Sequence, residues 1–299
     1  MANKDMNDIE VQKAKQRKRE ARRKFFRAFF SRKVVIIGVV GTLFFIFCAV
    51  FAPVLSSYNP NKTSFSESLQ DPSATHILGT DTLGRDLFTR LLYGARVSLI
   101  VGVLAVVVSF IIGTFIGMLA GYYGGIVDHL VMRACEVIRA IPQIALTMLL
   151  LAMFGSSMLT MAIILGFSGV PGYIRMMRAQ VMKEREADYI MASKLLGMKA
   201  LPLMYIHLLP NCISPVLVMM TQQVGGTIMM ESGLSFLGIG IRVPQASWGS
   251  MVNDGRSYLL DHPYLAIAPG ACVAALVISL NLLGDGIRDA LDPRLRGSI

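Results

Sequence analysis

The chain has 299 residues, of which 54% are hydrophobic and only 16% are charged, and its formal net charge at pH 7 is +10. Soluble domains are about 45–50% apolar and about 25% charged, so this composition excludes an ordinary soluble enzyme, a disordered chain and a coiled coil. We predict an all-α polytopic membrane protein, in which the length serves several membrane crossings rather than one aqueous core.

Residues 1–33 form a strongly basic tail, with twelve Lys or Arg and four Asp or Glu. Both a nucleic-acid-binding segment and a cytoplasmic anchor beside anionic lipid would carry such a charge. An uncharged run begins at once, at Val34, and this favours the anchor. We therefore predict a cytoplasmic tail and no nucleic-acid partner.

Six apolar segments follow, each long enough for a crossing, which takes about 20 residues. Their expected positions are 34–55, within 97–127, two crossings in 140–174, 211–234 and 263–284. The uncharged segment 140–174 is too long for one crossing, and Gly155-Ser156-Ser157 is its natural turn. We expect the first segment to be an uncleaved peripheral span, because it is too long for the apolar part of a signal peptide.

The distribution of basic residues predicts the orientation of these six helices. With the N-terminus inside, the inner segments are 1–33, roughly 122–139, 175–210 and 285–299, and the outer ones are 56–90 and 236–263. The inner segments hold 23 Lys or Arg against 5 in the outer ones, so both termini are expected in the cytoplasm. The chain then divides into a tail, a peripheral helix, an extracytoplasmic segment, a five-helix core and a cytoplasmic C-terminal tail. Their expected bounds are 1–33, 34–55, 56–94, 95–286 and 287–299.

No pattern in the sequence predicts catalysis, a cofactor or a metal site. The four histidines are scattered, the four cysteines lie in or beside apolar runs, and no GxxxxGK[ST] loop is present to cradle a nucleotide phosphate. We expect a non-catalytic protein. If ATP drives its transport, a separate subunit must supply the ATPase.

The segment 183–210 has the pattern of two short helices. A helix is expected from Lys183 to Leu196, because good helix formers fill this stretch and its acidic residues lie in the first turns. Gly197 is a natural helix stop, and Pro202 can open a second short helix before the fifth span begins at Pro210. This segment is either a protruding loop that binds a partner protein, which we call the knob, or a solvated linker between spans. Its length favours the knob.

Polar side chains in the fifth span are candidates for a transport path. Gln222 and Gln223 lie about 17 Å beyond Asn211, near the middle of the bilayer. They either line the path or hold helices together. Glu231 lies about 30 Å along the same helix, where it is either an outer gate or a wet interfacial carboxylate.

Gly113, Gly117 and Gly121 give the second span two consecutive GxxxG steps. This strip lets another helix approach closely. It is either a packing seam in a moving bundle or a generic helix contact.

Several motifs resemble those of a known family. The pattern Ala192-Ser193-x3-Gly197-x11-Leu209-Pro210 resembles the cytoplasmic EAA loop of ABC importer permeases, with Met191 in the place of that motif's Glu. Three other segments resemble signatures of oligopeptide/dipeptide-type permeases. These are 76–86 with the following 92–98, 234–240 with the following Pro244 and 247–249, and 281–295.

The resemblance covers about residues 34–297 and points to the shorter permease partner of the peptide/nickel importer class. It implies a six-helix type I ABC importer permease fold in a bacterial-type cell membrane. The implied partners are the lipid bilayer, a second homologous permease subunit in a heterodimer, two ABC ATPases and an extracytoplasmic substrate-binding protein.

In that family the helix of the EAA loop docks into a groove of the ATPase. The residues that the resemblance assigns to this coupling loop are Glu186, Ala187, Asp188, Ala192, Ser193, Leu196, Gly197 and Pro210. The substrate it implies is a short peptide, with nickel chelates, glutathione or another small solute as alternatives. An ATP-independent channel or secondary carrier is the rival of a different class, and it does not explain the knob.

Overall fold

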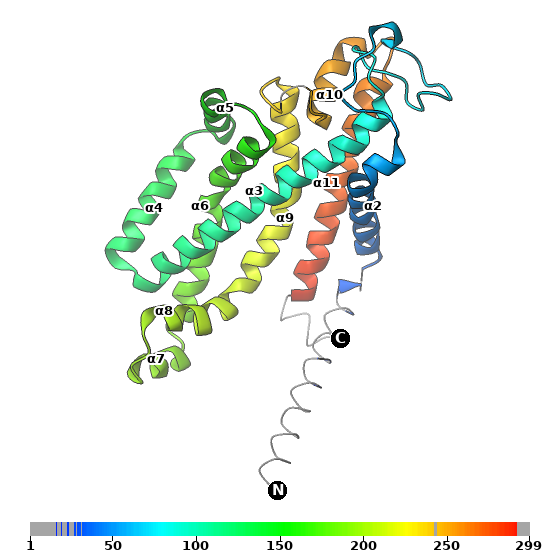
Figure 1. Cartoon of the computed structure of the whole chain (residues 1–299). Helices are drawn as coiled ribbons and strands as arrows, with labels where there is room; N and C mark the ends of the chain where they lie inside the picture. The colour runs from blue at the N-terminus through cyan, green and yellow to red at the C-terminus, as the bar shows by residue number, and fades with distance from the viewer. Residues whose placement is uncertain are drawn as a thin grey trace.

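The computed structural model describes residues 32–241 and 244–291, together with Gln16, Arg19, Arg23, Arg27, Phe29 and Phe30. Most of the basic tail 1–33 and of the C-terminal tail 287–299 lies outside the described residues. The described part contains helices and no β-strand, which confirms the predicted all-helical fold. The helices are α2 Lys33–Leu55, α3 Leu87–Tyr123, α4 Gly125–Ala140, α5 Gln143–Phe154, α6 Met158–Glu184, α7 Asp188–Leu195, α8 Ala200–Leu203, α9 Leu209–Phe236, α10 Trp248–Gly255 and α11 Tyr264–Leu291 (Figure 1).

Five helical stretches of the described residues are long and apolar enough to cross a membrane. They are α2, α3, α6, the continuous stretch Ala200–Phe236 that ends with α9, and α11. The helices α4 and α5 form a sixth crossing if this pair, bent by 86°, is counted as one broken span. Figure 1 shows the pair rising beside α6, so a polytopic bundle of five or six crossings is present.

The third crossing differs from the sequence prediction. A straight span was expected at the start of 140–174, but α5 has only 12 residues and follows α4 across a break at Ile141 and Pro142. Proline has no N–H and disfavours helical geometry in the residue before it, so the helix must break here. The segment 122–139, expected in the cytoplasm, corresponds largely to α4. Its cytoplasmic position stays a prediction, because α4 belongs to a crossing only if the bent pair is counted as one span. The predicted turn at Gly155-Ser156-Ser157 is confirmed, because α5 ends and α6 begins there.

The helix α3 is much longer than the apolar run that predicted it. It begins at Leu87, where the Asp86 side chain caps the helix by accepting a hydrogen bond from the backbone N–H of Thr89. Its 37 residues extend about 55 Å at 1.5 Å per residue, more than the thickness of a bilayer core, and Figure 1 shows it crossing the bundle obliquely. The boundary predicted at residue 95 lies inside this helix.

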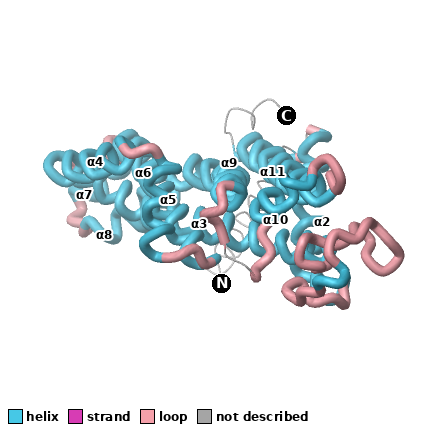
Figure 2. Tube along the Cα trace, turned by 90° about the horizontal axis from the view of Figure 1, so that it is seen from above, coloured by secondary structure: helices cyan, strands magenta, loops and turns pink. Residues whose placement is uncertain are grey.

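The helix α9 lies at the centre of the bundle. Viewed from above, α9 lies between a group formed by α4, α5 and α6 and another formed by α2, α10 and α11 (Figure 2). The helix α2 packs on α3 and α11, and its other face exposes large apolar side chains, among them Ile37, Val40 and Val54. Such a face suits contact with lipid, as expected for a peripheral span.

Candidate functional site

The loop between α6 and α9 protrudes from one end of the bundle. Figure 1 shows α7 and α8 beyond the ends of α6 and α9. The predicted start of the loop helix at Lys183 is wrong: α6 continues to Glu184, the chain turns, and α7 begins at Asp188. A five-residue π-helical turn, Met204–Leu208, joins α8 to α9, so the second short helix runs directly into the membrane span.

Gly197 ends α7 at the predicted position. Its φ angle is +79°, a conformation that glycine adopts without steric cost. The N–H of Gly197 donates to the carbonyl of Lys194 at 3.0 Å, and that of Met198 donates to the carbonyl of Ser193 at 3.1 Å. These two bonds are the Schellman arrangement, so the direction in which the chain leaves α7 depends on this glycine.

The loop has one anchored face and one free face. Ile190, Leu203 and Leu208 are fully buried in a cluster with residues of α3, α6 and α9. Leu195 and Leu196, in contrast, are 89% and 88% exposed at the end of α7. We call this exposed leucine pair the apolar tip. Adjacent leucines this exposed on an ordered loop indicate a contact surface for another protein.

Hydrogen bonds from Tyr189 fix α7 to the two spans beside it. Its hydroxyl donates to the Glu184 carboxylate at the end of α6 and accepts from the Asn211 amide of α9 at 3.0 Å. Partial burial and the bond to Glu184 raise the pKa of Tyr189 to about 12, so the phenol stays protonated near neutral pH and keeps this donor role. The loop is therefore tied to the spans that a movement of the tip would displace.

The coupling-loop residues expected from the sequence lie on this protrusion and at its junction with α9. Those exposed are Glu186, Asp188, Ala192, Leu196, Gly197 and Pro210, and those partly buried are Ala187 and Ser193. Their contact with an ATPase stays a prediction.

Gln222 and Gln223 face different surroundings although they are neighbours. The Gln222 amide donates to Asp285 of α11 at 3.4 Å, and its backbone and side chain pack on Gly284. Gln223 lines two cavities of about 330 and 150 Å³. Gln223 therefore lies beside a cavity, and Gln222 contacts α11. Whether either lines a transport path stays a prediction.

Glu231 is not the exposed carboxylate expected at the outer end of α9. Its side chain is fully buried and accepts hydrogen bonds at 2.8 Å from the hydroxyls of Ser235 and Ser247. Ser247 directly precedes α10, so this carboxylate ties α9 to α10. This burial contradicts the alternative of a solvated carboxylate at the membrane interface, and a role of Glu231 in an outer gate stays a prediction.

The glycine strip of α3 faces α6. A Cβ atom on Gly113 would lie 2.4 Å from Cβ of Tyr173, one on Gly117 2.5 Å from the carbonyl oxygen of Ile174, and one on Gly121 2.8 Å from Cβ of Val181. All three positions are buried. The two helix backbones approach so closely along this strip that no side chain fits between them.

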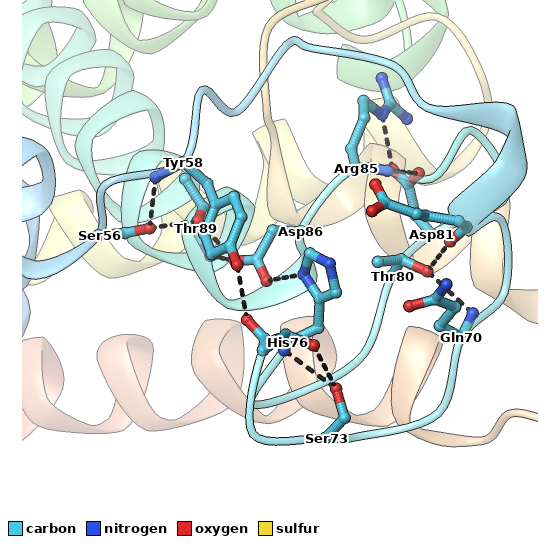
Figure 3. Close-up of polar contacts among 12 residues, drawn as sticks. Ser56, Tyr58, Gln70, Ser73, His76, Thr80, Asp81, Arg85, Asp86 and Thr89 are labelled. Atoms are coloured by element: carbon cyan, nitrogen blue, oxygen red, sulfur yellow. Dashed lines mark hydrogen bonds and ion pairs between the residues drawn. The ribbon is translucent and has the colours of Figure 1, made fainter.

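A polar cluster at the N-terminal end of α3 was missed in the sequence analysis. Figure 3 shows Arg85 directed at Asp81, and His76 directed at Asp86. The Arg85 Nε donates to Asp81 at 2.6 Å, and His76 Nδ1 lies 2.9 Å from Asp86. These four side chains are buried.

Arg90, in the first turn of α3, joins this cluster to the start of the loop 56–86. It is 2% exposed, pairs with Asp81 at 3.4 Å and donates to the carbonyl of Pro60 at 3.0 Å. The cluster therefore fastens the loop 56–86 onto the start of α3. The sequence signal for it was the concentration of Asp and Arg at 81–90, directly before an apolar run.

Two family comparisons match this chain. Residues 113–297 match the family described as "binding-protein-dependent transport system inner membrane component". Residues 21–72 match the "N-terminal TM domain of oligopeptide transport permease C". Together the two matches include α2 and most of the bundle.

Curated relatives match over nearly the whole chain. A dipeptide transport system permease protein of Alkalihalophilus pseudofirmus is 39% identical over 274 residues, which is 92% of this chain and 90% of the relative. The corresponding protein of Bacillus subtilis is 41% identical, over 89% of this chain and 83% of its own length. A glutathione transport system permease protein of Pectobacterium atrosepticum is 36% identical, over 92% and 91%.

Proposed function

The chain belongs to the family of inner membrane components of binding-protein-dependent transport systems, and we propose on that premise that it is a permease subunit of an ATP-driven importer of short peptides. The observation that carries the peptide assignment is the similarity over most of the chain to permeases named for dipeptide transport. The amide of Gln223 beside two cavities supports it, since an amide both donates to and accepts from a peptide backbone without reading its side chains.

The proposed assembly contains a second homologous permease, two ABC ATPases and an extracytoplasmic binding protein. The chain itself has no phosphate-cradling loop, so ATP hydrolysis falls to the ATPase subunits and this chain is non-catalytic. The exposed apolar tip is the surface on which one ATPase docks. Closure of the ATPases displaces the tip, and the bonds of Tyr189 carry this displacement to α6 and α9, so that the bundle alternates between inward-open and outward-open states.

Deleting this chain should remove growth on peptides. A strain that requires an amino acid and receives it only within di- to pentapeptides should stop growing, whereas the free amino acid should support normal growth. Reintroducing the chain should restore peptide use. Unimpaired growth on peptides would contradict the assignment, and a defect in nickel-dependent enzyme activity instead would move it to nickel uptake.

Glutathione is the second candidate substrate, because one relative is named for its transport. Growth of the same deletion strain on glutathione as its sole sulfur source distinguishes glutathione from other short peptides as the substrate. Loss of growth there with normal growth on other peptides would favour glutathione. A loss on both would indicate a broad peptide importer, because glutathione is itself a small peptide.

The proposed orientation places the apolar tip and both termini in the cytoplasm. A reporter that is active only in the cytoplasm should give signal when fused after Gly197, at the end of α7, and none when fused after Asp71, in the loop before α3. The basic-residue asymmetry is the physical reason. The reverse pattern of signals would overturn the orientation.

A further inference from the structure

The broken pair α4–α5 forms one wall of the larger cavity beside Gln223. This cavity has a volume of about 330 Å³, within the range of small-molecule pockets, about 300–1,000 Å³. Its lining comes from the end of α4, the start of α5, the middle of α6 and the middle of α9: Ile138, Arg139, Ile141, Pro142, Gln143, Leu146, Ser168, Gly169, Pro171, Gly172 and Gln223.

The cavity lies near the middle of the two spans α6 and α9 that wall it. Gln223 is about 21 Å along α9 at 1.5 Å per residue, roughly halfway through this 28-residue helix. Ser168 and Gly172 likewise lie near the middle of α6, which runs from Met158 to Glu184. A solute that crosses beside α9 therefore passes this cavity.

Arg139 gives the cavity its charge. No Asp or Glu occurs among the lining residues of the described chain, and Arg139 makes no hydrogen bond or ion pair within the described ranges. Of the neighbouring charges, Arg133 lies 2.8 Å from Glu136 and Asp128 is bonded to Arg178 of α6. Arg175 of α6 has no ion pair or hydrogen bond within the described ranges either, but it does not line this cavity. Arg139 is exposed, and an unpaired charged side chain in a membrane-spanning segment typically faces a water-filled path or a ligand.

The groups beside Arg139 suit a carboxylate followed by an amide backbone. Gln143 donates to the Ser168 hydroxyl at 3.1 Å, which leaves its amide oxygen and a second N–H for a ligand. The first turn of α5 has no side-chain cap, so its free N–H groups add positive potential next to the guanidinium. Gln223 supplies a further amide from the opposite wall.

We propose that Arg139 binds the C-terminal carboxylate of the peptide in transit, with Gln143 and Gln223 as partners of the adjacent peptide groups. The guanidinium holds a carboxylate through two parallel hydrogen bonds, a geometry that lysine does not reproduce. Every unmodified peptide carries this carboxylate, so the site is selective for peptides as a class and indifferent to their side chains. The proposal rests on the proposed function for its substrate, and on the cavity alone for its preference for anions.

Peptide uptake by the complete transporter tests whether Arg139 binds the carboxylate. Arg139→Gln should lower uptake of a dipeptide by about tenfold or more, as expected for a lost charged hydrogen bond, and Arg139→Lys should restore only part of it. Arg133→Gln is the matched control, since Arg133 lies on the same helix outside the cavity, and it should transport normally. Equal uptake by Arg139→Gln and wild type, or an equal loss in both glutamine variants, overturns the proposal.

A labelling experiment tests the site without transport. A cysteine at Ser168→Cys should react faster with an anionic than with a cationic thiol reagent of similar size, after subtraction of the wild-type reaction. Adding Arg139→Gln should lower this ratio about fivefold or more, because the local positive potential is gone. Dipeptide should slow the labelling, and less so in the Arg139→Gln background.

The uptake and labelling experiments together distinguish a failure of the carboxylate site from a failure of the proposed peptide substrate. A reagent ratio that does not respond to Arg139→Gln means that this side chain reaches outward to lipid headgroups, and it overturns the carboxylate site. If wild-type transporter fails to take up peptides while the reagent ratio still responds to Arg139, the site binds anions and the substrate assignment is the part that fails.

Discussion

Replacing Gly197 by valine should abolish peptide uptake while the chain still inserts into the membrane. The φ angle of +79° at this position costs an L-residue about 1–2 kcal/mol, and β-branched residues tolerate it least. A Cβ atom at Gly197 would meet nothing within 4 Å, so the expected damage comes from the backbone alone. Relief of the strain breaks the two Schellman bonds and turns the apolar tip away from its partner.

Gly155→Val is the matched control for this variant. Gly155 has a φ of +81° and equally open surroundings, but it lies in the turn between α5 and α6, far along the chain from the apolar tip. It should lose comparable stability and retain uptake. The measurement is peptide uptake together with peptide-stimulated ATP hydrolysis by the full complex. Normal uptake and normal stimulation in Gly197→Val would contradict the role of the loop in coupling.

Replacing Gly113 by leucine should prevent the bundle from folding stably. The new Cβ would lie 2.4 Å from Cβ of Tyr173 and 2.9 Å from the carbonyl oxygen of Val170. Part of this obstacle is backbone, so it cannot move aside by changing a rotamer. Overpacking a close contact costs about 1–3 kcal/mol, and here it forces α3 and α6 apart along the whole glycine strip.

The expected result is a large loss of detergent-extractable, monodisperse protein and a lower melting temperature of what remains. Gly226→Leu is the control, because the nearest atom to a Cβ there is Gln223 Oε1 at 3.8 Å. That variant should keep a near-normal yield. Equal yields for the two variants would show that the strip tolerates separation of α3 from α6.

Properties that depend on short segments were predictable from the sequence. The apolar crossings follow from composition over about 20 residues. The predicted number of six agrees with the structure if the bent pair α4–α5 is counted as one crossing. Glycines at 155 and 197 interrupt helices because backbone conformation is a local property. The motifs at 76–98, 192–210 and 281–295 indicated the family for the same reason, since each is contiguous or nearly so.

The surroundings of single side chains were decided by tertiary structure. Gln222 and Gln223 are adjacent in sequence, yet only the positions of α11 and α6 determine which of them faces a cavity. Glu231 is buried because α10 brings Ser247 to it from 16 residues away, which no helical pattern within α9 could reveal.

Arg139 is the clearest case of this division. Its place in the sequence, between an amphipathic stretch and an apolar run, predicted a cytoplasmic position under the positive-inside rule. That position stays a prediction, because α4 belongs to a crossing only if the bent pair α4–α5 is counted as one span. The fold places Arg139 at a cavity whose other walls come from α6 and α9. The sequence therefore indicated an all-helical bundle of several crossings and the places of two glycine-dependent turns. Which groups share a cavity was decided only by the fold, because residues far apart in the chain supply its walls.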